Sequence, residues 1–246
     1  MQEVLKNKMI QMKLYGMQQA YQTLLESGKH QALTNDEVIS LLVQTEWEER
    51  ETRKVDRFLL NAHFRYQASL DEVDFNNNRN LDKTLIMRLA DSSFIKRKED
   101  VLICGPTGVG KSYLASVFGH QACNNGYRVV YFNTQKLFAR LKMAKGDGSY
   151  FKEITRIGKQ DLLILDDFGL APLDNTQRDI LMEIVEDRHG IRSTLISSQL
   201  PISSWYEIIG ESTIADAILD RLVHKAHRLE LQGSSMRKKQ LKEEIL

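Results

Sequence analysis

The segment Gly105-Pro-Thr-Gly-Val-Gly-Lys-Ser112 constrains this chain of 246 residues more than any other stretch. It matches the P-loop pattern, in which glycines precede a lysine and a serine at fixed spacing. The apolar residues Val101–Cys104 before it favour a strand, and Tyr113–Phe118 after it can continue as a helix. Because glycines let backbone N–H groups close around phosphate oxygens at the start of a helix, the segment predicts a nucleoside triphosphate site.

Each residue type in this loop has an expected task. Lys111 is expected to reach the β- and γ-phosphates, and the Ser112 hydroxyl is expected to help hold Mg²⁺. The expected nucleotide contacts are Gly105, Pro106, Thr107, Gly108, Val109, Gly110, Lys111, Ser112 and Tyr113. The alternative is a chance glycine-rich turn, which is disfavoured because the flanking strand and helix are both present.

A second motif lies at Asp161–Gly169. Its apolar run Leu162–Leu165 is typical of a central parallel strand that is covered on both faces. The run ends in Asp166 and Asp167, at the strand end where open α/β sheets place their ligands. Asp166 is expected to act as the Walker-B ligand of Mg²⁺, and Asp167 to polarise the attacking water. The alternative, a solvated acidic turn, is disfavoured by the P-loop upstream.

The two ends of the chain differ in pattern. Apolar residues recur at helical spacing from residue 1 to about residue 70, with Gly28 as a helix stop and Thr34-Asn-Asp-Glu37 as a capping box. The pattern breaks at Leu70–Phe75 and at the asparagine-rich segment Asn76–Asn80, which favours a loop. The charged face of the second helix, Glu46–Lys54, is either solvated or a partner surface. We therefore expect a small all-helical N-terminal domain that contacts a partner or DNA, and a nucleotide-binding domain over residues 76–246.

The rest of the chain predicts the sheet around the P-loop strand. A helix is expected over Leu81–Phe94, and further strands alternate with helical segments, as in a parallel α/β sheet flanked by helices. The expected strands are Arg128–Phe132, Leu162–Leu165, Ser193–Gln199 and Ala226–Leu231.

Residues 128–159 carry an excess of positive charge around the flexible tip Gly146-Asp-Gly148, with Tyr150 and Phe151 beside it. Basic groups with adjacent aromatic rings suit contact with a nucleic-acid backbone. An ordinary basic surface is the alternative. The candidate DNA contacts are Lys136, Arg140, Lys142, Lys145, Lys152 and Arg156.

Net charge, cysteine content and hydropathy bear on the partners and the compartment of the protein. The formal net charge of +1 does not by itself indicate a nucleic-acid-binding protein. The two cysteines, Cys104 and Cys123, have no metal-ligand spacing and suit a reducing compartment. The sequence has no signal-peptide pattern and no apolar run that could span a bilayer, so we expect a cytoplasmic protein with no membrane partner.

Together these features resemble the AAA+ ATPases of the IstB/DnaC kind, which are insertion-sequence transposition helpers and replicative helicase loaders. Besides the two motifs above, the resemblance rests on Ala217–His224, Gly233–Arg237, and the Ser-Thr-Leu-Ile-Ser-Ser stretch before a proline and Trp205. The N-terminal segment with Leu70–Phe75 resembles the IstB type in particular.

The resemblance implies roles for further residues. Arg221 matches the arginine finger, which acts on ATP in the neighbouring subunit. Arg237 matches the sensor-2 arginine, and Gln199 falls at the sensor-1 position, where the family usually has asparagine. Asp167 is one methylene shorter than the glutamate of many AAA+ proteins.

The function that this resemblance implies is an ATPase with ATP and Mg²⁺ as cofactors. It would assemble as a homo-oligomer on duplex DNA and assist a transposase in target selection. The alternative is a DnaC-like helicase loader. From another class, a non-hydrolysing binding module or a metabolic kinase would use the P-loop without assembly. No DDE-type arrangement of acidic residues is found, so the chain is not expected to cut DNA itself.

Overall fold

The computed structural model describes residues 2–28, 32–75 and 79–236. The chain forms two compact units, Met1–Arg57 and Phe58–Leu246. The sequence placed the domain boundary after residue 75, whereas residues 58–75 lie with the second unit. The physical reason is burial, because Ala62, Ala68 and Val73 pack into the same hydrophobic cluster as the sheet of that unit.

The first unit is helical. It contains α1 (Gln2–Gln11), α2 (Tyr15–Ser27) and most of α3 (Asn35–Ala62). Gly28 ends α2 in the left-handed conformation, with a φ of 65°. The predicted capping box of α3 is confirmed, because Glu37 N–H donates to Thr34 Oγ1 at 3.3 Å and Thr34 N–H donates to Glu37 Oε2 at 2.7 Å.

One residue of the predicted charged face of α3 is buried. Glu46 is only 5 % exposed, and its Oε2 accepts hydrogen bonds from the backbone N–H groups of Gly16 and Met17 at the start of α2. A Cβ on Gly16 would lie 2.6 Å from Thr45 O, so only glycine allows this approach of α2 to α3. The expectation that Glu46 lies on an exposed face was therefore wrong, because this carboxylate caps a neighbouring helix.

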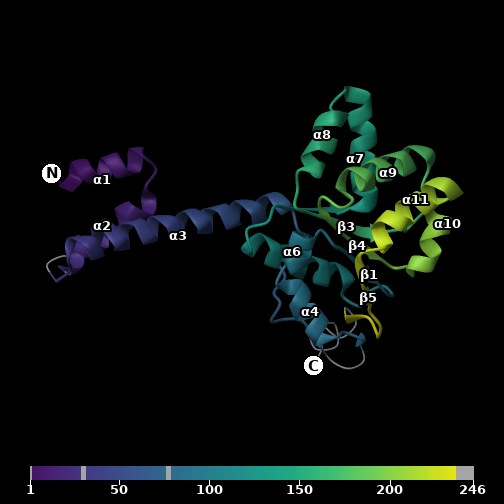
Figure 1. Ribbon diagram of the computed structural model, residues 1–246, viewed down its shortest axis with the longest axis horizontal. Helices are drawn as coiled ribbons and strands as arrows, with labels where there is room; N and C mark the ends of the chain where they lie inside the picture. Colours follow the sequence, from purple (N-terminus) through teal and green to yellow (C-terminus); the bar gives the residue numbers. More distant parts are fainter. Residues whose placement is uncertain (1, 29–31, 76–78, 237–246) are drawn as a thin grey trace, which may run out of the picture. The chain divides into compact units, whose positions relative to one another are not determined.

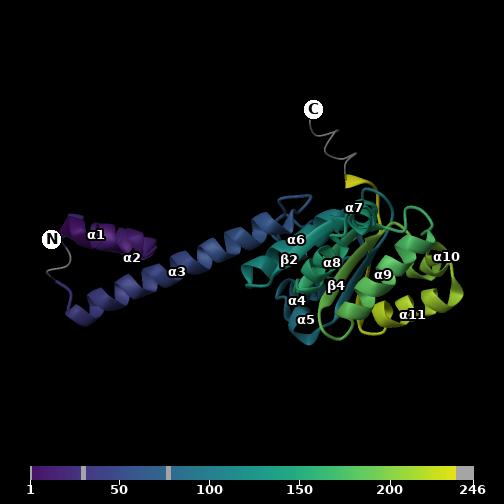
Figure 2. The same ribbon diagram turned by 90° about the horizontal axis from the view of Figure 1, so that it is seen from above.

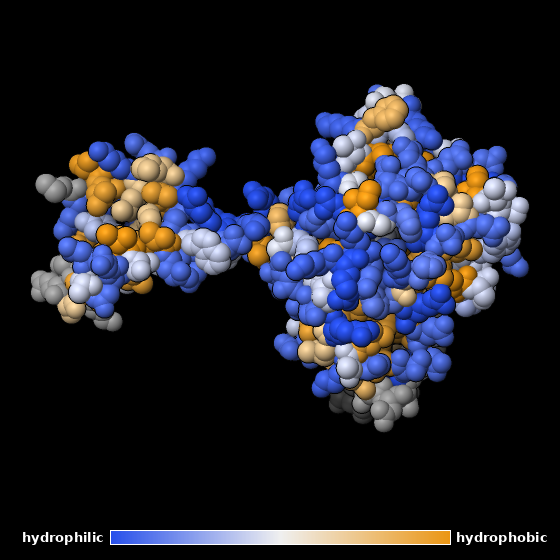
Figure 3. All heavy atoms as spheres, viewed as in Figure 1, coloured by the Kyte–Doolittle hydropathy of each residue, from blue (hydrophilic) through white to orange (hydrophobic). Residues whose placement is uncertain are grey.

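The surface of the first unit also carries apolar side chains (Figure 3). On α3, Ile39, Val43 and Trp47 follow one another at intervals of four residues and are 59 %, 52 % and 61 % exposed. Residues at this spacing lie on one helix face. This face is thus an apolar stripe on the outside of the unit.

The second unit is built on a sheet of five parallel strands in the order β2-β3-β4-β1-β5 (Figure 1). The strands are β1 (Asp100–Cys104), β2 (Val129–Asn133), β3 (Leu162–Phe168), β4 (Ser193–Ser198) and β5 (Ala226–Glu230). The four strand positions predicted from the sequence, and that of Val101–Cys104, are confirmed, although β3 runs three residues further than predicted. The P-loop follows β1, and Asp166 and Asp167 lie near the end of β3. These two strands are separated in the sheet by β4 alone.

Helices cover both faces of this sheet (Figures 1 and 2). One face packs on α4 (Lys83–Ala90), α5 (Ser93–Arg97) and α6 (Lys111–Asn124). The other packs on α7 (Thr134–Asp147), α8 (Tyr150–Gly158), α9 (Asn175–Arg188), α10 (Trp205–Ile209) and α11 (Ser212–Val223), with the short 3₁₀ helix Ile202–Ser204 before α10.

Strand β3 shows why its sequence is apolar throughout its first four residues. Leu162 and Ile164 enter the core cluster on the α6 face, while Leu163 and Leu165 enter the cluster on the α7 face. All four side chains are at most 1 % exposed. A strand segment buried on both faces needs no polar position, as the sequence predicted.

The helix predicted over Leu81–Phe94 is two helices, α4 and α5. The chain turns at Ser92, whose φ is 62°. Asn125 Nδ2 donates to Asp91 O and to Ser92 Oγ, at 3.4 and 3.1 Å. This contact comes from a residue far along the chain, so the helical pattern alone did not reveal the break. No helix in the described parts of the chain is long and apolar enough to cross a membrane.

Candidate functional site

The P-loop joins β1 to α6 as a glycine cradle. Gly105, Gly108 and Gly110 have φ values of 148°, 84° and 94°, a region that side chains rarely adopt. A Cβ on Gly105 would lie 2.3 Å from Leu231 O, and one on Gly108 would lie 2.2 Å from Ser235 Oγ. These glycines are therefore required both by the backbone turn and by the chain that passes beside it.

Lys111 begins α6 and is only 6 % exposed. Its Nζ donates to Pro106 O at 2.8 Å, so the ammonium group lies across the mouth of its own loop. A buried lysine beside backbone N–H groups at a helix start is the arrangement that binds phosphate.

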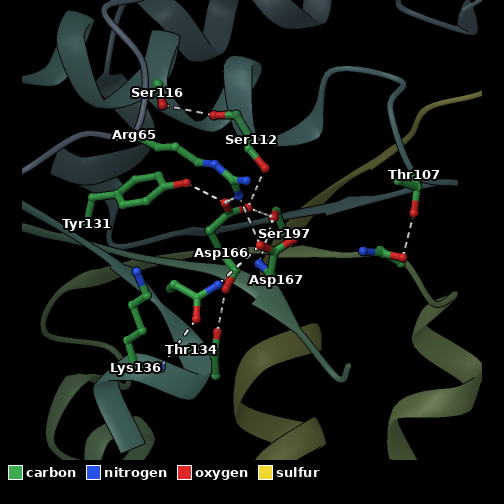
Figure 4. A network of polar contacts seen from close by, with 12 residues as sticks. Arg65, Thr107, Ser112, Ser116, Tyr131, Thr134, Lys136, Asp166, Asp167 and Ser197 are labelled. Carbon is green, nitrogen blue, oxygen red and sulfur yellow. Dashed lines mark hydrogen bonds and ion pairs between the residues drawn. The ribbon is translucent and has the colours of Figure 1, made fainter. Parts of the chain in front are cut away.

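Asp166 lies at the centre of a polar network (Figure 4). It is fully buried, and its Oδ1 accepts from Ser112 Oγ at 2.9 Å and from Ser197 Oγ. Its Oδ2 accepts from the Tyr131 hydroxyl. Burial and then the Asp166 charge raise the pKa of Tyr131, so this phenol remains a neutral donor. The structure thus brings together the two predicted Mg²⁺ ligands, Ser112 and Asp166.

Asp167 follows in the left-handed conformation, with a φ of 57°, where the β3–β4 register shifts. Its Oδ2 accepts from Asn133 Nδ2 at 3.1 Å and from Arg65 Nη1 at 3.0 Å. No described residue donates to its Oδ1. The contacts that hold this carboxylate among the described residues are therefore both made by Oδ2.

Gln199 follows β4 and reaches the P-loop. The Thr107 hydroxyl donates to Gln199 Oε1 at 2.6 Å. This contact is possible because β4 lies beside β1 in the sheet. The structure thus places the residue predicted as sensor 1 at the predicted phosphate loop.

A cavity of about 730 Å³ lies at this site. The lining includes Lys111, Ser112, Asp167, Gln199 and Tyr113. The residues fit Mg·ATP, because the glycine cradle leaves room for phosphates and the Ser112 and Asp166 oxygens are the hard ligands that Mg²⁺ takes together with phosphate oxygens.

Besides Tyr131 and Ser197, which contact Asp166, three residues of the site were not predicted from the sequence. Arg65 contacts both carboxylates, and Asn133 holds Asp167. Arg79 donates to Val109 O at 2.6 Å and to Asp74 O at 2.8 Å, which ties the P-loop to the segment before α4. Only Asn133 carried a usable signal, because it ends an apolar strand at the edge of the sheet where ligands bind.

Arg221 lies on α11 and does not line this cavity. Its Nη2 lies 2.8 Å from Glu186 Oε2, and its Nη1 donates to Ala217 O at 2.9 Å. Arg237, predicted as sensor 2, lies outside the described residues. The residue before it, Met236, donates its N–H to Gly108 O at 2.9 Å, so the described chain reaches the P-loop at this point.

The six candidate DNA contacts lie on α7 and α8, but they differ in their pairing. Arg140 and Arg156 both pair with Glu153, at 2.9 and 3.3 Å. Lys142 pairs with Asp174 at 2.5 Å.

The other three candidate contacts are lysines that have no acidic partner among the described residues. Lys145 Nζ lies 4.9 Å from the centroid of the Tyr150 ring. Within residues 2–28, 32–75 and 79–236, Lys136 and Lys152 have no acidic partner. Phe151, beside Lys152, is 78 % exposed. Among the six candidates, the positive charge that no described acid offsets therefore lies at these three lysines.

The parallel sheet, the P-loop and the Asp166 network define a nucleotide-binding protein of the P-loop class. Residues 7–244 match the model of the IstB-like ATP binding proteins, and the chain belongs to this family. It is 47 % identical over 234 residues to the insertion sequence ATP-binding protein y4pL of Sinorhizobium fredii, with 95 % of this chain and 96 % of that protein covered. It is 30 % identical over 219 residues to the IS21 ATP-binding protein of Pseudomonas aeruginosa, covering 89 % and 83 %.

Solved structures share the fold. The DnaC helicase loader superposes with a TM-score of 0.59 at 23 % identity, covering 68 % of this chain and 98 % of that one. AMPPCP-bound DnaA from Aquifex aeolicus gives a TM-score of 0.57 at 16 % identity, covering 74 % and 56 %. The chain is thus an IstB-like ATP-binding protein of insertion sequences with the fold of the DnaC and DnaA proteins.

Proposed function

We propose that this chain is a Mg²⁺-dependent ATPase that assembles on duplex DNA and assists a transposase. The observation that carries the ATPase part is the 2.9 Å contact between Ser112 Oγ and Asp166 Oδ1, with Asp167 next in the chain. A P-loop hydroxyl and a buried carboxylate in contact form a metal-ligand pair at the end of the cradle.

Different residues of the chain are assigned to phosphate binding, to activation of the attacking water and to closure of the site. Lys111 and the P-loop N–H groups bind the phosphates and hold the terminal phosphoryl group. Bound Mg²⁺ supplies positive charge to the phosphate oxygens during transfer. Asp167 Oδ1 orients the attacking water and takes its proton, while Asn133 fixes the other oxygen of the same carboxylate. Thr107 and Gln199 close the side of the site that faces β4.

Arg221 is proposed to complete the site of a neighbouring subunit. Its place on α11, outside the lining of its own cavity, supports this role. A guanidinium supplied by the next subunit implies a head-to-tail contact, which gives a ring or a filament. ATP binding would then favour assembly, and hydrolysis would reverse it.

Duplex DNA is proposed to contact α7 and α8, with a transposase as the further partner. The lysines of these helices that lack an acidic partner among the described residues, Lys136, Lys145 and Lys152, support the DNA contact. The names of the relatives support the transposase, because those proteins belong to insertion sequences. The apolar stripe Ile39–Val43–Trp47 suits a protein partner of the first unit.

The test is binding of the full chain to fluorescent duplex and single-stranded DNA, each with ATP, ADP or no nucleotide, followed by hydrolysis with each DNA. We expect ATP-dependent assembly on duplex and faster hydrolysis there. Preference for single strands would instead support the helicase-loader alternative. Hydrolysis that is indifferent to either DNA would contradict the proposal.

A further inference from the structure

Arg65 reaches the nucleotide site from the segment that follows α3. Its Nη1 lies 3.0 Å from Asp167 Oδ2 and 3.4 Å from Asp166 Oδ2 (Figure 4). Asp166 therefore offers one oxygen to Ser112 and the other to a guanidinium. Arg65 also lines the same cavity as Lys111.

The residues on either side anchor Arg65 in this place. The Phe64 ring packs 4.4 Å from the His120 ring and 6.3 Å from the Tyr131 ring, measured between centroids. A Cβ on Gly119 would lie 2.3 Å from Phe64, so the glycine of α6 makes the space for this ring.

Tyr66 holds the other side. Its ring lies 6.1 Å from that of Tyr113, just after the P-loop, and the Arg65 guanidinium lies 5.6 Å from the Tyr66 centroid. The side chain of Arg65 is 41 % exposed, so it has room to move toward the cavity while its neighbours stay packed. The packing of Phe64 and Tyr66 therefore positions the Arg65 guanidinium beside the Asp166 and Asp167 carboxylates.

A guanidinium at this place opposes a metal ion. Arginine keeps its charge at any pH at which proteins fold, and a divalent cation held by Asp166 would lie beside it. The two cations compete for the Asp166 carboxylate. The terminal phosphate of a bound triphosphate offers the guanidinium another anion with matching bidentate geometry.

We propose that Arg65 is a positioning residue that competes with Mg²⁺ for Asp166 and is drawn away from it by the terminal phosphate of ATP. Metal binding thereby depends on the presence of a triphosphate, and the site discriminates ATP from ADP. This inference rests on the proposed Mg²⁺-dependent nucleotide site and adds to it a residue from outside the P-loop and the β3 motif.

The test measures metal binding without nucleotide. Mn²⁺ is titrated into the full chain, and free Mn²⁺ is followed by electron paramagnetic resonance. The variant Arg65→Gln is expected to bind Mn²⁺ roughly fivefold or more tightly than the original chain, because a unit charge next to the ligand is removed. Arg65→Lys keeps the charge and is expected to restore weak binding.

The matched control is Arg97→Gln. Arg97 is 47 % exposed and pairs with Glu99 at 2.9 Å, so this variant removes the same charge from a similar ion pair away from the cavity. It is expected to leave Mn²⁺ affinity unchanged. A purely structural Arg65 would give unchanged or weaker Mn²⁺ binding in Arg65→Gln, and that result would overturn the inference.

A second measurement compares ATPγS with ADP in the presence of Mg²⁺, by competition against a fluorescent nucleotide. The preference for the triphosphate is expected to fall severalfold in Arg65→Gln. An unchanged preference would overturn the second half of the inference. Neither measurement depends on hydrolysis, so the role of Arg65 can be decided even if the chain does not hydrolyse ATP. A chain that binds Mn²⁺ and nucleotide but hydrolyses no ATP would contradict the ATPase proposal alone.

Discussion

Asn133 donates its side-chain amide to Asp167 Oδ2 at 3.1 Å, while its own Oδ1 accepts the backbone N–H of Lys136 at 3.3 Å. A single residue thus ends β2, caps α7 and holds the proposed catalytic carboxylate. The helix that carries candidate DNA contacts starts at the same side chain that orients Asp167.

The variant Asn133→Ser separates these tasks. Serine caps a helix nearly as well as asparagine, so the free energy of unfolding should change by less than about 1 kcal/mol. Its hydroxyl is too short to replace the contact with Asp167, so hydrolysis should fall roughly tenfold or more at saturating ATP. Steady-state phosphate release and urea unfolding measure the two effects. Unchanged hydrolysis with lowered stability would show that Asn133 is only a cap.

Lys111→Ala is expected to weaken binding of a fluorescent ATP analogue by roughly 10- to 100-fold, because it removes a charge-assisted contact to phosphate. Lys152→Ala, on α8, removes the same charge elsewhere and should leave nucleotide affinity as it is. Equal affinity of both variants for nucleotide would contradict the assignment of the P-loop as the nucleotide site.

Arg221→Ala tests the proposed action on a neighbouring subunit. Nucleotide binding by the monomer should be unchanged, whereas DNA-stimulated hydrolysis should fall by roughly a thousandfold, as expected for an arginine finger. The control variant Glu186→Ala removes the ion-pair partner of Arg221 in the same chain but keeps the Arg221 guanidinium. It should retain stimulated hydrolysis, because a partly exposed surface pair contributes little, on the order of 1 kcal/mol, to stability. If both variants lose activity equally, the ion pair and not the finger is what matters.

The salt dependence of duplex binding tests the surface of α7 and α8. Replacing Lys136 and Lys152 with Gln removes charges that no described acid offsets, so the slope of log K against log salt should shrink by about 0.9 for each phosphate that is no longer neutralised. Replacing Lys142 and Lys145 should also flatten it, but the change at Lys142 should be smaller because Asp174 already offsets its charge. The double replacement of Lys96 and Lys225, which lie outside these helices, serves as the control. A slope that changes only in the control would place the DNA on another surface.

His120 predicts a pH dependence of stability. Burial lowers the pKa of His120 below its usual 6.5, and its Nε2 is buried without a hydrogen-bond partner among the described residues. The unfolded chain therefore binds more protons just below pH 6.5, so this contribution to stability is present above that pH and is lost as the pH falls through the lowered pKa.

His120→Phe keeps a ring against Phe64 but cannot be protonated. Its thermal midpoint should fall less between pH 7.5 and 5.5 than that of the original chain, because the phenyl ring takes up no proton. Parallel pH profiles for the two proteins would contradict this role of His120.

Local patterns in the sequence predicted most elements of the fold. The apolar run of β3, the capping box at Thr34–Glu37 and the glycine stop at Gly28 depend on neighbours within a few residues, and all are found in the structure. The break at Ser92 and the burial of Glu46 were not predicted, because each depends on a residue about 30 positions away.

The P-loop depends on residues that follow one another in the chain. Its glycines allow the positive φ values, its lysine and serine stand at a fixed spacing, and a short apolar run precedes it. The sequence by itself therefore determined the phosphate cradle, its Asp166 and the parallel sheet that carries them. Only the tertiary structure decided what surrounds them. Asp167 meets Arg65 from 102 positions earlier in the chain, and Thr107 meets Gln199 from 92 positions later. Such contacts follow from the order of the strands and the path of the loops, which bring distant side chains to one edge of the sheet.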